Sequence, residues 1–406
     1  MLNVIAHITK LLVKYRKHNL ELYRKLIILW GVFIFSFITR IFRFSYPKSP
    51  VFDENCYLQQ LLNISSHNVS RPIIGDLIVM NVKNIFSGNS LTNSIYSKNG
   101  ILGINKPYLI MKVINIFLSS CCPTLIAASL MVIGISDFVS FFCGLLICFE
   151  FSGVVRSRMI SGDSLFLFFC SMVLFLNSLL INNFKYEYSV LIACSIFTSL
   201  AFVTDFSGLV MVIYSLRNIL FGKKNIVKNI LIFSSILIFF ISIDLGLEVK
   251  ILHLNLKTIL SQKIINMKDF EQNKHPFYLF PLWKFAPKLL WKSNNQKYYL
   301  LNNPITLLLC FLFSVLRPDL LSSRFYLYSI YLIWLIKKPT NCIDYQLCFF
   351  FGVLSIGKAI QSLPLCSIIS SVFLIFNILI FSLWSPWVYC LIIKPEVDHS
   401  IDIWNH

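Results

Sequence analysis

Long apolar blocks separated by polar connections dominate the sequence. Most blocks are roughly 16 to 25 residues long, the length of helix that crosses about 30 Å of hydrocarbon. Because they lack strict apolar–polar alternation, and lipid offers no partner to backbone amides, they are predicted to be helices rather than barrel strands. The predicted spans are 26–43, 107–133, 136–152, 163–182, 188–204, 206–221, 229–247, 304–316, 320–336, 344–357 and 364–383. The pattern therefore predicts an all-α polytopic membrane protein with about ten or eleven transmembrane helices.

Basic residues are concentrated in residues 1–25, ahead of the first apolar block. Because Lys and Arg favour the cytosolic side of a membrane, the N-terminus is predicted to be cytosolic. Counting spans from there puts two long polar segments, 44–106 and 248–303, on the luminal side. The same count leaves the lysines of 223–228 in the cytosol, as the rule requires.

No internal repeat or low-complexity tract interrupts the chain. It is therefore interpreted as one membrane domain, 26–390, between the basic N-terminus, 1–25, and a C-terminal tail, 391–406. Channels and transporters more often distribute function along their spans, with helix breaks at the midplane. Two long polar segments on one face are instead typical of an enzyme that works at the membrane surface.

Composition agrees with a membrane protein and excludes other classes. The chain has 406 residues, of which 57% are hydrophobic and 13% charged, whereas soluble domains carry about 25% charged residues. Its net charge of +18 is explained by Lys and Arg at the ends of spans, so no nucleic-acid partner is expected. Most of the twelve cysteines lie inside apolar blocks, where they behave as small hydrophobic residues. No Cys or His spacing indicates a metal site, and we expect no metal.

The first candidate for chemistry is the acidic pair Asp53 and Glu54, about ten residues beyond the first span. A carboxylate partly desolvated near the bilayer and beside Phe52 is a better base than one in water. The alternative is a solvated acidic pair that caps a following helix.

A second candidate is the short connection between the spans 136–152 and 163–182. It contains or borders Glu150, Arg156, Arg158 and Asp163, and ionisable residues at a membrane boundary are a functional hypothesis by default. The planar fork of arginine suits a phosphate because it binds two oxygens at once. The alternative is interfacial anchoring, with Asp163 as a helix N-cap.

A third segment combines His275 with aromatic residues and prolines and continues to Asn303 and Pro304. His275 could carry a proton, but such segments usually form an aromatic belt at the interface. By itself the segment predicts no function.

Taken in order, these segments resemble the protein O-mannosyltransferase family, membrane glycosyltransferases of the GT-C fold. The family has an Asp-Glu pair followed by His-Pro-Pro-Leu-Gly, then Pro-Tyr-x-x-Met-Arg at its second span. Its third-span signature is Asp-x6-Ser-Arg-x-Ile-x-x-Asp, and a Tyr-Leu-Leu-Gly-Asn-Pro block precedes a later span. The corresponding residues here are Asp53-Glu54, Arg71 to Gly75, Pro107 to Lys112, then Glu150, Ser157, Arg158, Ile160 and Asp163, and Tyr299 to Pro304.

The resemblance implies a GT-C bundle with two long luminal loops in the membrane of the endoplasmic reticulum. Its donor would be dolichyl-phosphate mannose, its acceptors Ser or Thr hydroxyls of secretory proteins, and its mechanism inverting. It implies no cofactor. The family usually works as dimers of related chains, so a related mannosyltransferase chain is the expected partner, alongside membrane lipids.

The resemblance also implies roles for single residues. Asp53 would take the proton of the acceptor hydroxyl, and Glu54 would orient the acceptor or support Asp53. Arg158 would stabilise the departing dolichyl phosphate, where negative charge grows in the transition state. Arg156 and Lys112 are the other expected phosphate-binding residues, and the expected supporting residues are Arg71, Glu150, Asp163, His275 and Asn303.

Three departures from the family pattern keep an alternative open. Family members commonly carry a β-trefoil domain of the MIR type in the second long loop, and 248–303 is too short for its twelve strands. Asp205-Phe206-Ser207-Gly208 stands where the family has Lys-Trp-Val-Gly, and a C-terminal His-His-Tyr-Leu-Pro motif is reduced to Leu363-Pro364. The alternative is a catalytically weak homologue that acts as the partner subunit of a mannosyltransferase dimer.

Overall fold

The computed structural model describes most of the apolar part of the chain. The described residues are 2–45, 72, 74–78, 81, 106–182, 187–222, 225–253, 255–259, 261, 288–293, 296–300, 303–337, 346–389 and 391.

Every predicted span overlaps a helix, so the predicted all-α membrane fold is confirmed. The predicted number of ten or eleven transmembrane helices is too high, because the described helices make only six to eight spans. The elements are α1 (Leu2–Ile41), α5 (Lys106–Val132), α6 (Asp137–Cys148), α7 (Phe151–Ser157), α8 (Asp163–Ile181), α9 (Glu187–Thr204), η3 (Phe206–Gly208), α10 (Leu209–Leu220), α11 (Ile226–Leu252), β1 (Lys288–Ser293), β2 (Gln296–Leu300), α13 (Pro304–Leu316), α14 (Leu321–Lys337), α15 (Gln346–Gln361) and α16 (Cys366–Val388). The antiparallel hairpin of β1 and β2 lies within a segment for which the sequence predicts only a loop.

The helices differ in how much of a bilayer each could cross. In the part of the chain that the structure describes, six helices are long and apolar enough to cross a membrane alone. The number of spans rises to eight if each of two bent helix pairs is counted as one more span. The bent pairs are α6 with α7, at 60°, and α13 with α14, at 116°. The shorter apolar helix α15 is buried along nearly its whole length, because it packs against α6, α13 and α14.

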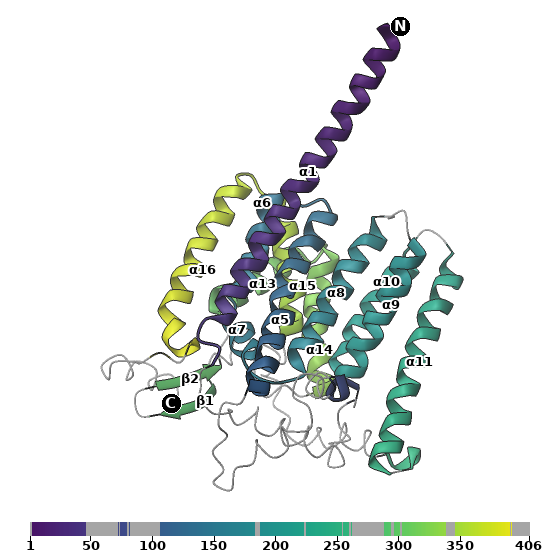
Figure 1. The fold of residues 1–406 in the computed structure, drawn as a ribbon, viewed down its shortest axis with the longest axis vertical. Helices are drawn as coiled ribbons and strands as arrows, with labels where there is room; N and C mark the ends of the chain where they lie inside the picture. Colours follow the sequence, from purple (N-terminus) through teal and green to yellow (C-terminus); the bar gives the residue numbers. More distant parts are fainter. Residues whose placement is uncertain are drawn as a thin grey trace.

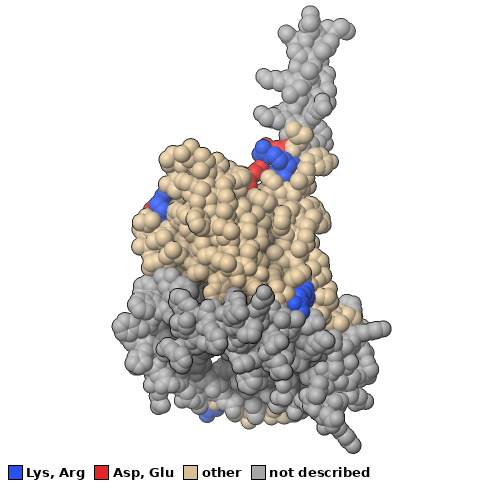
Figure 2. Space-filling view, turned by 90° about the vertical axis from the view of Figure 1, so that its left-hand side faces the viewer, with Lys and Arg blue, Asp and Glu red and all other residues tan. Residues whose placement is uncertain are grey.

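The helices form one bundle, with α1 extending beyond it at its N-terminal end (Figure 1). Within the bundle, α8 packs against both α5 and α9, and α11 packs on α9 at one edge. Large apolar side chains are exposed along α11 and α16, among them Ile238 and Phe239 on α11 and Ile375 and Phe376 on α16. Figure 2 shows a broad surface with few charged residues among those coloured. A membrane-spanning bundle has such a surface because hydrocarbon rather than water surrounds it.

The described ends of the two long polar segments meet at the same end of the bundle. The backbone carbonyl of Arg43, at the start of the first segment, accepts a hydrogen bond from Arg158. The backbone N–H of Asn303, at the end of the second, donates to Glu150. Both partners belong to the connection between α6 and α8, so this connection organises that end of the molecule.

The junction of η3 and α10 depends on the absence of a side chain at Gly208. A Cβ there would lie 2.7 Å from the backbone of Ala201 and Phe202. We expect Gly208→Ala to lower the free energy of unfolding by about 1–3 kcal/mol, as overpacking does, and to lower the thermal unfolding midpoint measured in detergent micelles.

Gly246, inside α11, is the matched control, because no atom lies within 4 Å of a Cβ built there. Gly246→Ala is expected to leave the midpoint unchanged or to raise it, since Ala favours a helix over Gly by up to about 1 kcal/mol. A Gly208→Ala protein as stable as Gly246→Ala would contradict the close packing of η3 on α9.

Candidate active site

The connection between α6 and α8 carries the ionisable cluster singled out in the sequence. Ser136 begins α6 as its N-cap by accepting a hydrogen bond from the N–H of Val139. The chain bends after Cys148, forms the single short helix α7, and turns through Arg158 to Gly162 into α8. A break of this kind leaves backbone groups without helical partners, and these need other partners because lipid offers none.

Arg158 joins the ends of three helices. It is 1% exposed, and it donates to the backbone carbonyls of Val388 at 2.8 Å and Arg43 at 2.6 Å. Its guanidinium also lies 5.4 Å from the centre of the Tyr389 ring, while the Tyr389 hydroxyl donates to the carbonyl of Thr39. Carbonyls at helix C-terminal ends carry partial negative charge. The cation therefore holds the ends of α1, α7 and α16 together, a scaffold role that the sequence did not predict.

Arg156 and Asp163 form an ion pair at 3.5 Å between α7 and α8. The side chains are 17% and 33% exposed, so the pair lies at the margin of the bundle. The alternative interpretation of Asp163 as an N-cap is wrong, because Gly162 occupies that position and Asp163 is the first residue of α8. Its carboxylate still suits the positive end of the helix dipole.

Lys112 is fully buried on α5. Asn115, three residues further along the same helix, donates to the backbone carbonyl of Met159 at 2.7 Å. Residues three apart lie on nearly the same face of a helix. The face of α5 that bears Lys112 therefore packs toward the turn that contains Arg158.

Glu150 lies at the bend between α6 and α7 and is 4% exposed. Its Oε1 accepts hydrogen bonds from the Ser152 hydroxyl at 3.0 Å and from the Asn303 backbone N–H at 3.2 Å. The Ser152 hydroxyl in turn accepts from Nε2 of Gln346, on α15, at 2.9 Å. A buried carboxylate is stabilised by such donors, and these link the bend to two other helices.

Asn303 extends the same network. Its side-chain oxygen accepts from the N–H of Ile305 and caps α13, while its Nδ2 donates to the carbonyl of Phe149 at 3.2 Å. The same nitrogen lies 3.3 Å from the side-chain oxygen of Asn377 on α16. Two family motifs far apart in the sequence, at Glu150 and Asn303, are therefore in direct contact.

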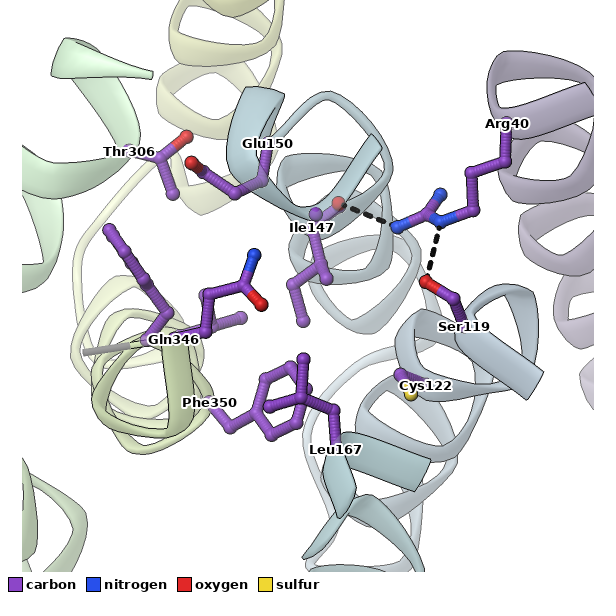
Figure 3. Close-up of a pocket in the computed structure, with 12 residues that line it drawn as sticks. Arg40, Ser119, Cys122, Ile147, Glu150, Leu167, Thr306, Gln346 and Phe350 are labelled. Carbon is purple, nitrogen blue, oxygen red and sulfur yellow. Dashed lines mark hydrogen bonds between the residues drawn. The ribbon is translucent and has the colours of Figure 1, made fainter. Parts of the chain in front are cut away.

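A small cavity lies beside this network, and Figure 3 shows Glu150 and Gln346 on one side of it and Arg40 on the other. Arg40 is 1% exposed and donates to the hydroxyls of Ser119 at 3.1 Å and Ser36 at 2.7 Å. Arg40 is not among the residues predicted from the sequence, although an arginine in the last turn of an apolar span is itself a signal of a functional or structural role.

The cavity has a volume of about 30 Å³, which is room for about two water molecules. Ligand pockets are typically about 300–1,000 Å³. It is therefore too small for a sugar, and it belongs to the scaffold.

The remaining predicted site residues, Asp53, Glu54, Arg71 and His275, lie outside the described residues. Asp205, where the family has a lysine, is the N-cap of η3: its Oδ1 accepts from the N–H and the hydroxyl of Ser207. Within the described ranges, no group of three or more His, Cys, Asp or Glu residues is arranged to hold a metal ion.

Comparisons with known proteins bear on the fold and the family of the chain. A structure of the S. cerevisiae protein O-mannosyltransferase Pmt1-Pmt2 complex bound to the sugar donor matches with a TM-score of 0.71 at 12% identity, over 93% of this chain and 92% of that chain. The apo structure of ArnT from Cupriavidus metallidurans matches with a TM-score of 0.46 at 13% identity, over 84% of this chain and 60% of that one. No curated protein matches the chain.

The first of these similarities shows a shared fold. The model of the dolichyl-phosphate-mannose-protein mannosyltransferase family matches residues 30–260, which is more than half of the sequence. The chain therefore belongs to the dolichyl-phosphate-mannose-protein mannosyltransferase family and is a glycosyltransferase.

Proposed function

We propose that this protein transfers mannose from dolichyl-phosphate mannose to Ser or Thr hydroxyls of secretory proteins, with inversion at the anomeric carbon. The observation that carries the proposal is the connection between α6 and α8. It gathers Arg156 and Arg158 at the end of the bundle where the described ends of both long polar segments meet. Cations near a membrane boundary suit a lipid-linked phosphate, and the segment 44–106 supplies the acids.

In the proposed reaction Asp53 acts as the general base. Its carboxylate accepts the proton of the acceptor hydroxyl as that oxygen bonds to the anomeric carbon. The bond from that carbon to the phosphate oxygen breaks, and its electron pair leaves with dolichyl phosphate. Attack on the face opposite the leaving group inverts the configuration, and Glu54 orients the acceptor.

Stabilisation of the leaving phosphate falls to the basic residues of the site. The negative charge on the phosphate grows as the glycosidic bond breaks, so a fixed cation lowers the energy of the transition state more than that of the ground state. Arg158, Arg156 and Lys112 are the proposed cations. The hydrogen bond from Arg158 to the Arg43 carbonyl supports this assignment, because it ties the cation to the start of the segment that carries Asp53.

We propose an orientation for the bundle from the arginines at its opposite end, Arg24 and Arg317. Arg24 pairs with Asp137 at the start of α6, and the Ser136 N–H donates to Gln361 at the end of α15. Arg317, after α13, donates to Ser362 beside it. Since Lys and Arg favour the cytosolic side, we propose that this end is cytosolic. The active site would then face the lumen of the endoplasmic reticulum.

We also propose that the protein acts as a dimer with a related mannosyltransferase chain, as in the Pmt1-Pmt2 complex with which it shares its fold. The reduced C-terminal motif and the short second polar segment support a need for such a chain. If the protein is instead a catalytically weak subunit, mannose transfer should survive the loss of Asp53.

Asp53→Asn is the direct test of the mechanism. We expect it to lower mannose transfer by about 10²- to 10⁴-fold, the usual contribution of a general base, in microsomes supplied with dolichyl-phosphate mannose and a Ser/Thr-rich peptide. Asp319→Asn is the matched control: Asp319 pairs with exposed Arg317 at the opposite end of the bundle, so transfer should remain at the wild-type level.

The same assay separates the enzyme from its alternative. Equal transfer by wild type and Asp53→Asn would contradict the catalytic assignment. Transfer that requires a co-expressed related chain, and that survives Asp53→Asn, would identify the protein as a partner subunit.

Glu150 is expected to support the site through its acceptor oxygen rather than through its charge. Glu150→Gln keeps an oxygen for the Asn303 N–H, so the thermal unfolding midpoint in detergent should stay near that of the wild type. Glu150→Ala leaves that buried N–H without its acceptor, which costs about 1–3 kcal/mol, and should lower the midpoint. Equal midpoints for the two variants would show that the contact between the two motifs contributes nothing to stability.

A further inference from the structure

A short helical segment, residues 74–78, belongs to the first long polar segment and lies against the membrane helices. The backbone N–H of Ile74 donates to Oδ1 of Asp244 on α11 at 3.1 Å. Ile74 is 8% exposed and Asp244 4% exposed. The bond therefore lies inside the molecule, although its partners are 170 residues apart.

Asp244 is unusual for its helix. The helix is apolar and few of its residues are buried. Ile243, immediately before Asp244, is exposed, whereas Asp244 and Glu248 are buried acids. A carboxylate in such a helix is costly unless it is hydrogen-bonded. The first N–H groups of a helical segment lack intrahelical partners and carry partial positive charge, so they are suited to an acidic side chain.

A second contact holds the same segment from another direction. A Cβ built on Gly75 would lie 2.8 Å from Cγ2 of Thr204 and 3.2 Å from its Cα. Thr204 is the last residue of α9, and its hydroxyl donates to the Leu200 carbonyl at 2.7 Å. The segment therefore approaches the end of α9 so closely that no side chain fits between them.

We propose that Asp244 and Thr204 are positioning residues that dock residues 74–78 onto α11 and α9. This docking fixes the far end of the stretch that carries Asp53 and Glu54. The near end is fixed by the hydrogen bond from Arg158 to the Arg43 carbonyl, so the described chain is anchored both before and after the acidic pair. The inference rests on the proposed function, because it assigns the docking a part in placing the catalytic acids. Asp244 itself touches neither donor nor acceptor in this role.

Two substitutions at Asp244 test whether its hydrogen bond to the Ile74 N–H docks residues 74–78. Asp244→Asn keeps an acceptor oxygen for the Ile74 N–H, whereas Asp244→Leu removes it. We expect Asp244→Leu to lower the rate of mannose transfer at least tenfold at saturating donor and acceptor, and Asp244→Asn to stay within about threefold of wild type. Gly246→Ala, two residues further along α11 with open space around it, is the control for a general effect of altering this helix.

The contact between Gly75 and Thr204 can be tested independently with single and double variants. Gly75→Ala should lower transfer through its clash with Thr204, although Ala normally favours a helix. Thr204→Ser removes the Cγ2 methyl, which makes the shortest contact, and keeps the hydroxyl, so Gly75→Ala with Thr204→Ser should recover part of the lost rate. Equal rates for Asp244→Leu and Asp244→Asn, or a Gly75→Ala protein as active as wild type, would overturn the inference.

A cross-link tests the docking without any activity. A Cβ on Gly75 would lie 3.3 Å from Cβ of Thr204, close to the separation of about 3.5–4.5 Å in disulfides. Gly75→Cys with Thr204→Cys should form a bond under mild oxidation. With a protease site placed at 183–186, its two fragments should stay together on a non-reducing gel, whereas either single variant should separate.

These experiments distinguish a failure of the docking from a failure of the proposed function. Fragments of the double variant that separate would overturn the docking. A wild-type protein that transfers no mannose, alone or with a related chain, would instead contradict the proposed function, while the cross-link would still decide whether residues 74–78 lie on α9.

Discussion

The hydrogen-bonding needs of the backbone at helix ends and breaks are the constraint on which this structure depends. Lipid has no donors, so each carbonyl released at a break inside the bundle needs a side chain. Polar residues supply these donors: Arg40 to Ile147, Asn303 to Phe149, Asn115 to Met159, Tyr389 to Thr39, and Arg158 to Arg43 and Val388. The buried polar side chains around α7 thus satisfy the backbone of the bent connection and of the ends of α1 and α16 beside it.

This constraint changes how the cations of the site are understood. A phosphate-binding arginine and a scaffold arginine are alike in sequence, because both are rare and costly in an apolar environment. In the structure Arg158 already has scaffold partners, and Arg156 has Asp163. Any role in catalysis is therefore built on a residue that the fold also needs, so loss of activity alone would not separate the two roles.

The sequence predicts the helices well because span length and hydropathy are local properties. All of the predicted apolar blocks contain helix, and the placement of Glu150 and Arg158 in one connection follows from their spacing. Contacts across the chain could not be predicted in this way. The bonds from the Asn303 N–H to Glu150 and from the Ile74 N–H to Asp244 join residues 153 and 170 positions apart. The bend between α13 and α14 likewise could not be predicted, because the two blocks read as separate spans but are long and apolar enough only as a bent pair.

The acid on α11 has a consequence for the order in which the protein is made. Ile74 is synthesised long before Asp244, so the partner of the acid already exists when α11 leaves the ribosome. Before docking, Asp244 and Glu248 give α11 two acidic residues near its C-terminal end, and each acid makes insertion of a helix less favourable. The hydrogen bond from the Ile74 N–H to Asp244 then removes part of that cost, so an earlier part of the chain stabilises α11 after its insertion.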